Sequence, residues 1–378
     1  MNYEIKLDKE SELLASLENK NDTESLRMKR YLSMPDLSRT EGSPIREIVN
    51  RILNIEDFKD FDIIKAPEVV PTDVTFDLYN FAPDHPARSR SDTYFFDDKY
   101  ILRPHTTVMW YYYLTQDEIK KKIENKETLG FFSFGKVYRK DEIDRNHMNV
   151  FHQMDGGFLI PKSKKEVTIE DLQNVLSGIA KAVFGPDIKY RFNKDTFPYT
   201  DPSLEMEVEI GGRWIEVLGC GIMTDTIIKN LGLDPNEWSN WAFGFGLERL
   251  AIISMDLPDI RLLWSDDERV KKQLHLGQKF IEVSKFPPIT RDISFIVPKT
   301  FVPNDYFDLV RELAGDLIEE ISLMDKYEND AKFGNDKMSY AFHIVYRSIE
   351  RTLTSEEIEI LHKKVEEETV SKFNAVIR

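Results

Sequence analysis

The stretch LEMEVEIGGRWIEVLGCG, residues 204–221, restricts the fold of this chain more than any other part of its sequence. Its first half alternates apolar residues with glutamates, and a period of two is typical of a strand with one dry and one wet face. Gly211-Gly212 then supplies the two-residue turn of a β-hairpin, so Glu207 faces Glu216 across the pair. Because facing carboxylates repel each other unless a cation lies between them, the pair predicts a site for a divalent metal such as Mg²⁺. The alternative is a shifted register, in which the glutamates only keep one face of the sheet wet.

The remaining periodicity predicts an α+β protein in which this hairpin belongs to a central domain. Residues 1–42 are polar and end in a turn-rich stretch, which we interpret as an extension with a short helix and a linker. Residues 43–278 alternate strands with amphipathic helices, and Pro287-Pro288 marks a boundary near the start of a smaller domain, residues 279–378. Its expected elements are a strand at 291–297, a helix at 306–321, strands at 323–327 and 339–347, and a helix at 355–373, the order of a split α/β sandwich.

Composition excludes several classes of protein. The chain has 378 residues and one cysteine, so it cannot form an internal disulfide, and a reducing compartment is expected. No run approaches 18 consecutive apolar residues, so we expect no membrane span. A net charge of −16 argues against a uniformly basic nucleic-acid binder and leaves a local basic patch open. The acid-rich N-terminus lacks an apolar signal core, which favours the cytoplasm, a mature mitochondrial or plastid matrix protein being the alternative.

Charged side chains gather between two strand-like runs in VYRKDEIDRNHMNVFHQMDG, residues 137–156. Arg139 stands late in the first run, and alternation places it on the same face as Asp141. A guanidinium suits a phosphate, and an adjacent acid can accept a hydrogen bond from an exocyclic amine such as that of adenine. His147 could reach a second phosphate, and Phe151 offers a face for stacking. The same pattern also fits a solvated hairpin in which Arg139 and Asp141 form an ordinary ion pair.

Two further segments have the composition of ligand-binding sites. Gly244-x-Gly246 precedes a helix, which suggests close approach of the backbone to a ligand, and Arg249 in that helix either points to a phosphate or pairs with a surface acid. The segment is not a dinucleotide fingerprint, because the third glycine is absent. His105 stands beside threonines in RPHTT, where it either binds a carboxylate or an ammonium group or is an ordinary loop histidine.

Taken in order, these segments resemble the motifs of class II aminoacyl-tRNA synthetases, and among them phenylalanyl-tRNA synthetases of the single-chain, organellar type. DIIKAPEVV resembles the first class II motif, GKVYRKDEIDRNHMNVFHQMDG the second, and AFGFGLERLAI with PDIR the third. NFAPDHPAR, LRPHTT, FPYTDPSLEME and WIEVLGCG resemble the phenylalanine branch. KFPPITRDISFIVP, LVRELAGDLIEE and ERTL resemble its anticodon-binding domain. The resemblance, over residues 43–378, implies an antiparallel sheet flanked by helices and a C-terminal ferredoxin-like α/β sandwich.

The resemblance also implies a two-step ligase reaction, in which ATP activates phenylalanine as an adenylate and the acyl group moves to the 3′ end of tRNA(Phe). Such chemistry needs positioning and charge neutralisation more than acid–base help. By match to the family's motifs, the residues that bind ATP are Arg139, Asp141, His147, Phe151 and Arg249, and the two arginines are catalytic. Mg²⁺ is bound by Glu216 and Glu207. The residues that bind the amino acid are His105, Thr107, Gln153, Asp155, Phe197, Tyr199 and Ala242. Lys285, Arg291, Arg347 and Arg351 are candidate anticodon contacts. We expect a monomer that needs no separate β subunit.

Three residues depart from the family pattern where the substrate would sit. Tyr199 stands in place of a phenylalanine, Asp155 in place of a glutamate, and Trp110 in place of a glutamine. A hydroxyl added to a pocket wall needs a partner, or it destabilises by about 1–3 kcal/mol. Tyr199 therefore either bonds a neighbouring group and leaves a phenylalanine pocket intact, or binds a polar group of a different amino acid. Two alternatives remain: a paralogue that activates another amino acid, and a non-catalytic tRNA-binding protein that has kept the fold.

Overall fold

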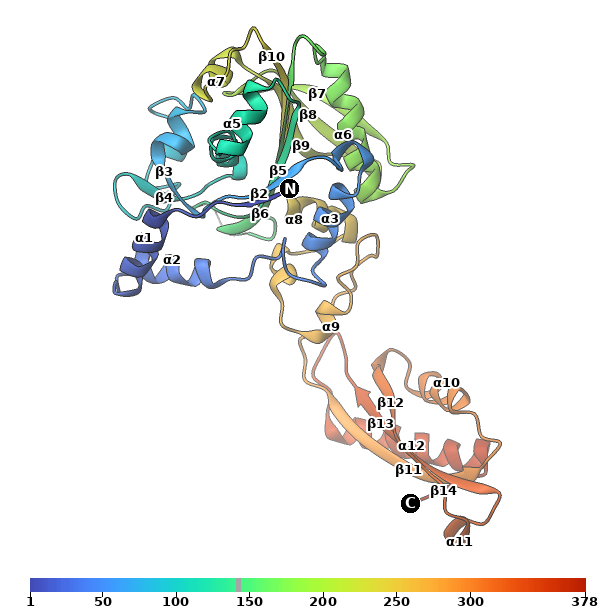
Figure 1. Cartoon of the computed structure of the whole chain (residues 1–378). Helices are drawn as coiled ribbons and strands as arrows, with labels where there is room; N and C mark the ends of the chain where they lie inside the picture. The colour runs from blue at the N-terminus through green and yellow to red at the C-terminus, as the bar shows by residue number, and fades with distance from the viewer. Residues whose placement is uncertain (141–143) are drawn as a thin grey trace. The chain divides into compact units, whose positions relative to one another are not determined.

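The computed structural model describes residues 1–140 and 144–378, which form two compact units, Met1–Phe280 and Ile281–Arg378. Each unit has a hydrophobic core of its own. Figure 1 shows the first unit in blue to yellow and the second in orange and red. Because each unit buries apolar surface by itself, each has the physical character of a domain.

A large mixed sheet forms the centre of the first unit. Three strands at one edge of the sheet are parallel to one another, and all other neighbouring strands are antiparallel. The predicted antiparallel sheet is therefore confirmed from the third strand onwards. Among the described residues the strands are, in spatial order, β1 (Asn2–Glu4), β2 (Asp62–Lys65), β5 (Leu129–Tyr138), β6 (Val150–Pro161), β10 (Trp238–Gly246), β9 (Arg213–Met223), β8 (Thr200–Ile210) and β7 (Tyr190–Phe197), with β3 (Val69–Pro71) and β4 (Tyr100–Leu102) as a separate pair.

Helices cover both faces of this sheet, and Figure 1 shows α5 (Asp117–Glu124) and α6 (Ile169–Phe184) on opposite sides of it. α6 begins with a capping box of Thr168 and Asp171 and ends at Gly185. The other helices of the unit are α1 (Asp8–Glu18), α2 (Thr23–Ser33), α3 (Pro44–Leu53), α4 (Met109–Leu114), α7 (Asp225–Asn230), α8 (Leu247–Met255) and α9 (Glu268–Lys271). Throughout the described residues, no helix combines the length and the apolarity that crossing a membrane requires.

The β8–β9 hairpin has the register that its sequence predicts. Gly211-Gly212 forms the turn with positive φ at both residues, and Glu207 pairs with Glu216. Separate cations relieve the repulsion between the two carboxylates. Arg191 on β7 lies 2.5 Å from the carboxylate of Glu207, and Arg249 on α8 lies 3.4 Å from that of Glu216. The facing pair is tolerated because each carboxylate has an arginine of its own.

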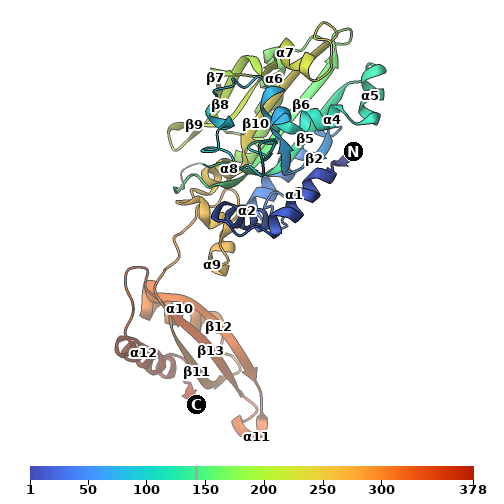
Figure 2. The same cartoon turned by 90° about the vertical axis from the view of Figure 1, so that its left-hand side faces the viewer.

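Residues 1–42, predicted as an extension with a short helix and a linker, contain β1, α1 and α2, which contact the rest of the first unit. β1 pairs with β2, and the N-terminal ammonium group lies 2.6 Å from Oδ1 of Asp62. Figure 2 shows α1 and α2 alongside the other elements of the first unit. Their few buried side chains, among them Leu17 and Tyr31, join a core cluster with Leu102 and Tyr138. The composition was misleading because each helix buries only a narrow apolar stripe and keeps its other side chains in water.

The second unit is the split sandwich that the sequence predicts, and the largest differences in element boundaries lie where α10 ends and β12 begins. The helix expected at 306–321 ends at Ala314, because Gly315 takes a positive φ of 54° and the next strand begins at Ile318. Among the described residues its sheet contains, in spatial order, β12 (Ile318–Tyr327), β13 (Lys337–Tyr346), β11 (Ile289–Pro298) and β14 (Val376–Ile377), and its helices are α10 (Pro303–Ala314), α11 (Asp330–Phe333) and α12 (Ser355–Phe373).

Candidate active site

The first unit contains a cavity of about 1050 Å³. A volume of this size is at the upper end of the range for ligand pockets. Its walls come from segments far apart in the sequence, which the neighbouring strands β6, β10, β9 and β8 bring together. The predicted site residues that line it are His105, Thr107, Arg139, His147, Phe151, Gln153, Asp155, Phe197, Tyr199, Glu216, Ala242 and Arg249, and Trp110 lines it with them.

Asp155 on β6 lies at the buried end of the cavity. Its carboxylate accepts hydrogen bonds from the hydroxyl groups of Thr106 and Thr107, the second at 3.1 Å. Burial raises the pKa of Asp155 to about 6, and the two hydrogen bonds offset only part of this effect. Gly244 pairs with Asp155, and a Cβ at this glycine would overlap the carboxylate. The close approach predicted for Gly244 is therefore to a protein side chain, whereas Gly246 has open space around the position of a Cβ.

Several polar atoms near Asp155 are buried without a hydrogen-bond partner among the described residues. They are both ring nitrogens of His105, Oε1 of Gln153 and Nε1 of Trp110. Burial, followed by the charge of Arg139, lowers the pKa of His105 to about 3, so its ring is neutral at ordinary pH. Buried polar groups are nearly always paired in folded proteins. Unpaired atoms gathered at a cavity wall therefore indicate that a polar ligand binds there.

Aromatic rings form the wall next to these polar atoms. The rings of Phe197 and Tyr199 are stacked, with centroids 6.0 Å apart and planes at 9°, and Trp110 meets Tyr199 edge-on at 6.3 Å. Gly219 leaves space for Phe197, since a Cβ there would lie 2.7 Å from the ring. Burial raises the pKa of Tyr199 to about 12, and its hydroxyl has no hydrogen-bond partner in the described part of the chain. The wall suits a flat apolar side chain and leaves one hydroxyl available to a ligand.

Two arginines line the more exposed part of the cavity. Nε of Arg139 donates to the carbonyl oxygen of Pro104 at 2.9 Å, and its guanidinium lies 5.2 Å from the centroid of the Phe151 ring. These two contacts hold the guanidinium in place. Arg249 reaches Glu216 at 3.4 Å, and the two side chains are 50% and 49% exposed. An ion pair this exposed contributes little stability, so Arg249 can turn to an anionic ligand.

The loop after β5 supplies His147, whose Nδ1 lies 2.9 Å from Oδ1 of Asp144. Asp144 also accepts hydrogen bonds from the backbone N–H groups of Asn146 and His147, and these bonds lower its pKa. This turn holds His147 at the cavity wall. Asp141, which was expected to bind adenine, lies outside the described residues.

The two glutamates predicted to share a metal have different surroundings. Glu216 lines the cavity, whereas the carboxylate of Glu207 is bonded by Arg191 and Asn193 on β7. Nowhere in residues 1–140 and 144–378 are three His, Cys, Asp or Glu side chains grouped so as to hold a metal ion. Mg²⁺ bound with a nucleotide needs only one or two carboxylates, because phosphates and water supply its other ligands. Glu216 fits that role, and Glu207 would have to leave its partners to share it.

The candidate anticodon contacts all lie in the second unit, and most of them have acidic partners. Arg347 is 14% exposed and also donates to the carbonyl oxygen of Phe286, which ties the end of β13 to the segment before β11. Lys285 is exposed near the ring of Phe286. The ion pairs are Arg291–Glu359 at 3.4 Å, Arg347–Glu319 at 2.7 Å and Arg351–Glu357 at 2.7 Å.

Three side chains of the cavity region were missed by reasoning from the sequence. The hydroxyl of Tyr79 donates to the carbonyl oxygen of Thr107 at 2.6 Å, and Phe81 stacks on His105 with centroids 6.0 Å apart. Thr106 holds the carboxylate of Asp155. Tyr79 and Phe81 belong to an irregular stretch without periodicity, so no pattern indicated which way their rings point. The only available signal was the density of aromatic residues in that stretch.

Comparison with known proteins identifies both units. The family described as tRNA synthetases class II core domain (F) matches residues 31–274, and the family described as ferredoxin-fold anticodon binding domain matches residues 284–378. The chain is 39% identical to a chloroplastic/mitochondrial phenylalanine–tRNA ligase of Arabidopsis thaliana, over 90% of this chain and 80% of the relative. It is 37% identical to a probable mitochondrial phenylalanine–tRNA ligase of Drosophila melanogaster, over 82% of this chain and 77% of the relative. The mitochondrial phenylalanine–tRNA ligase of Mus musculus is 36% identical, over 81% of this chain and 73% of the relative.

These matches confirm the resemblance that the motifs indicated. The core family covers more than half of the chain, and the relatives are similar over most of their own length. The cavity described above lies within the core match, and the candidate anticodon contacts lie within the second match. The chain therefore belongs to the class II tRNA synthetase family, together with these phenylalanine–tRNA ligases, and its second unit is a ferredoxin-fold anticodon-binding domain.

Proposed function

We propose that the protein is a phenylalanine–tRNA ligase, which activates phenylalanine with ATP and transfers it to the 3′ end of tRNA(Phe). The observation that carries this proposal is the division of one cavity into three parts. The aromatic wall of Phe197 and Tyr199 adjoins the unpaired polar atoms around His105, and Arg139 and Arg249 line the remaining part. These parts correspond to the ring, the ammonium and carboxylate groups, and the phosphates that meet in an aminoacyl adenylate.

In the activation step, a carboxylate oxygen of the amino acid attacks the α-phosphate of ATP, and pyrophosphate leaves. Contacts with Pro104 and Phe151 position Arg139 at the cavity, where its guanidinium neutralises charge on the α-phosphate. Arg249 binds the leaving phosphates. Glu216 would hold Mg²⁺, which would supply further neutralisation of charge when bound. The protein thus contributes position and charge, and no side chain has to transfer a proton.

The amino-acid part of the cavity favours an α-amino acid with an apolar ring. Asp155 is ionised above its pKa of about 6 and attracts the ammonium group of the substrate. Neutral His105 offers one N–H donor and one acceptor, and Gln153 offers its unpaired carbonyl oxygen. Ala242 also lines the cavity, and its side chain is a single methyl group, so it leaves space for the ring of a substrate.

The second unit would bring tRNA(Phe) to this site by binding its anticodon, with Lys285, Arg291, Arg347 and Arg351 as candidate contacts. Since one chain holds both modules, we propose a monomer that acts without a separate β subunit, which light scattering on the purified protein will test. The organelles in the relatives' names favour a mitochondrial or plastid matrix, and the composition favours the cytoplasm. Imaging of the tagged full-length protein in its own cells decides between these compartments.

The proposal is tested by ATP–pyrophosphate exchange with each of the twenty amino acids in turn. Phenylalanine is expected to stimulate exchange most strongly, and Arg139→Ala is expected to abolish it, because the α-phosphate then has no fixed cation. The control variant is Arg90→Ala, which removes an arginine paired with Asp98 on the surface. If the purified parent chain catalyses exchange but phenylalanine does not stimulate it, the proposal is contradicted. If no amino acid supports exchange, the protein is a non-catalytic member of the fold.

A second candidate function is activation of a different amino acid, and one observation favours it. Tyr199 and Trp110 both line the cavity, and neither the hydroxyl of Tyr199 nor Nε1 of Trp110 has a hydrogen-bond partner among the described residues. A substrate with a polar group on its ring, such as tyrosine, could satisfy one of them. The same exchange measurement decides, since the preferred amino acid gives the largest ratio of kcat to KM.

A further inference from the structure

His152 is a buried histidine that lies directly behind the active site. It stands on β6 between Phe151 and Gln153, which line the cavity, and alternation along the strand directs it to the opposite face. The side chain is fully buried. Its ring stacks on Trp264, with centroids 5.3 Å apart and planes at 26°. A histidine this enclosed needs partners for both ring nitrogens.

Both partners are present, and they come from different parts of the chain. Nδ1 lies 2.6 Å from Oε1 of Glu248, in the first turn of α8. The carboxylate of Glu248, itself 3% exposed, also accepts the backbone N–H of His152 at 2.8–2.9 Å. On the other side, the backbone N–H of Leu37 donates to Nε2 at 2.9 Å. A chain of contacts therefore runs from the N-terminal segment through β6 to α8.

The hydrogen bond from Leu37 fixes the position of the proton on the ring. An N–H that donates to Nε2 requires a lone pair on that nitrogen, so the ring proton sits on Nδ1 and faces Glu248. Oδ1 of Asp36 lies 3.4 Å from Nε2, and it accepts hydrogen bonds from the backbone and the hydroxyl of Ser38. Asp36 thus shapes the turn that presents the N–H of Leu37.

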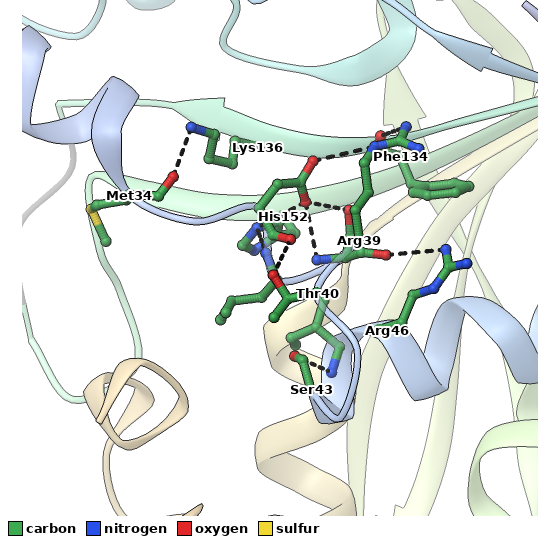
Figure 3. A network of polar contacts seen from close by, with 12 residues as sticks. Met34, Arg39, Thr40, Ser43, Arg46, Phe134, Lys136 and His152 are labelled. Atoms are coloured by element: carbon green, nitrogen blue, oxygen red, sulfur yellow. Dashed lines mark hydrogen bonds and ion pairs between the residues drawn. The ribbon is translucent and has the colours of Figure 1, made fainter. Parts of the chain in front are cut away.

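This turn is fastened to the sheet on both sides of Leu37. Figure 3 shows Lys136 reaching the carbonyl oxygen of Met34, at 3.0 Å, and Arg39 reaching that of Phe134, at 2.9 Å. The guanidinium of Arg39 also lies 4.3 Å from the centroid of the Phe134 ring. The segment 34–39 is therefore pinned to β5 at two points. It can act as a rigid support for the histidine.

From this geometry we propose that Leu37, His152 and Glu248 form a positioning chain that sets the place of Arg249 relative to β6. Glu248 directly precedes Arg249, so the hold of His152 on Glu248 fixes the first turn of α8 against the strand that carries Phe151 and Gln153. The N-terminal segment 34–39 thereby contributes to ATP binding without touching ATP. This inference rests on the proposed function, in which Arg249 binds the phosphates.

Two substitutions of His152 in the full-length chain separate positioning from simple packing. His152→Asn keeps an N–H near the position of Nδ1 and can still donate to Glu248, whereas His152→Leu fills similar space and cannot donate. We expect His152→Leu to raise the KM for ATP by about tenfold or more and to change the KM for phenylalanine by less than about threefold. His152→Asn keeps the donor to Glu248 and loses the acceptor for Leu37, so it is expected to raise the KM for ATP by less than His152→Leu does and to leave the KM for phenylalanine within about threefold of the parent.

Glu248→Gln is the complementary variant, because an amide has one oxygen acceptor in place of two and would turn its NH2 group toward a donor of His152. It is expected to raise the KM for ATP, and the effect should vanish when Arg249 is already Ala. Non-additive effects of this kind mark two residues that act through one another. The matched control is His362→Asn in the second unit, a buried histidine 3.0 Å from the hydroxyl of Tyr346, which should leave both KM values unchanged.

The inference is overturned if Glu248→Gln and Arg249→Ala have additive effects on ATP binding. It is also overturned if His152→Leu and His152→Asn lower the melting temperature and activity equally while both KM values stay at those of the parent, since this is the result of packing alone. Failure of the proposed function gives a different result, because the parent chain itself would then show no exchange stimulated by phenylalanine.

Discussion

Asp155, which we propose binds the ammonium group of the substrate, lowers the stability of the fold at neutral pH. Burial raises its pKa to about 6, whereas an aspartate in an unfolded chain titrates near about 3.9. Between these values the folded chain holds a proton that the unfolded chain has released. The free energy of unfolding therefore falls as the pH rises from about 4 to about 6, and the loss persists at higher pH. Thr106 and Thr107 reduce this loss by donating to the carboxylate.

Asp155→Asn is expected to remove this titration. Two pKa units correspond to about 3 kcal/mol, so the parent should lose up to about 3 kcal/mol relative to the variant between about pH 4 and pH 6.5. Urea unfolding of both proteins over this range measures the difference. Asp98→Asn, at a fully exposed side chain, is the control and should follow the parent curve. Parallel curves for the parent and Asp155→Asn would show that the buried carboxyl does not titrate in this range.

The hydroxyl of Tyr199 bears on which amino acid the cavity prefers. In Tyr199→Phe the stacked ring remains and only the unpartnered hydroxyl is lost, so the kcat/KM for phenylalanine should stay within about threefold of the parent. The kcat/KM for tyrosine should fall, because the hydroxyl of a tyrosine substrate can no longer form a hydrogen bond with the hydroxyl of residue 199. Tyr112→Phe, which removes another buried hydroxyl without a partner among the described residues, is the control. A loss of phenylalanine activation in Tyr199→Phe would place the hydroxyl in the reaction itself.

Among the secondary-structure elements, the β8–β9 hairpin shows how far a local pattern reaches. Its turn and the register from Ile210 to Glu207 follow from two glycines and alternation, and both are found as expected, whereas the register shifts between Glu207 and Met206. The roles of its two glutamates depend on what lies beside each strand. β7 brings Arg191 to Glu207, and α8 brings Arg249 to Glu216. Only the second glutamate is thereby placed at the cavity.

This difference predicts unequal effects on the metal requirement. Glu216→Gln should raise the Mg²⁺ concentration needed for half-maximal exchange by about tenfold, because the site loses its protein carboxylate. Glu207→Gln is the matched variant on the facing strand and should change that concentration by less than about twofold, since Arg191 and Asn193 already occupy its carboxylate. Titration of Mg²⁺ at fixed ATP measures both. Equal effects would mean that the two carboxylates share the ion after all.

Element boundaries follow the strength of local signals. α12 (Ser355–Phe373) has the predicted bounds because a capping box at Thr354 and Glu357 starts it and Asn374, with positive φ, ends it. α10 is shorter than predicted because the apolar pattern of the helix continues into β12 without a break in composition. Periodicity reports which residues are apolar, and Gly315 was the only local sign of the change.

At the scale of the whole molecule, the two cores make the catalytic step separable from recognition of the tRNA. Residues 1–280, expressed alone, are expected to fold and to keep ATP–pyrophosphate exchange within about threefold of the full chain, because their core and cavity are complete. Charging of tRNA should fall by about 100-fold or more, since one of two binding modules is gone. Circular dichroism and the two assays measure this. Loss of exchange in a folded truncation would show that the second unit completes the catalytic site.

The sequence by itself determined the class of the protein and named most of the candidate site residues that line its cavity. Gly-Gly hairpin chemistry, strand alternation and helix caps are local, so they determined the hairpin register next to its turn and the bounds of α12. The ordered motifs named many of the residues that line the cavity, because the proposed binding of phosphate and an amino acid restricts which side chains can serve there.

Only the tertiary structure decided what depends on neighbours distant in the chain. The polar segment before residue 43 became part of the catalytic unit, because Leu17 and Tyr31 found apolar partners about a hundred residues away. The protonation of Asp155 was set by burial, and the sequence carries no signal for its depth. The contact between Leu37, His152 and Glu248 joins three segments that no local pattern relates. Periodicity and capping act over a few residues, whereas burial and charge pairing depend on which segments the fold brings together.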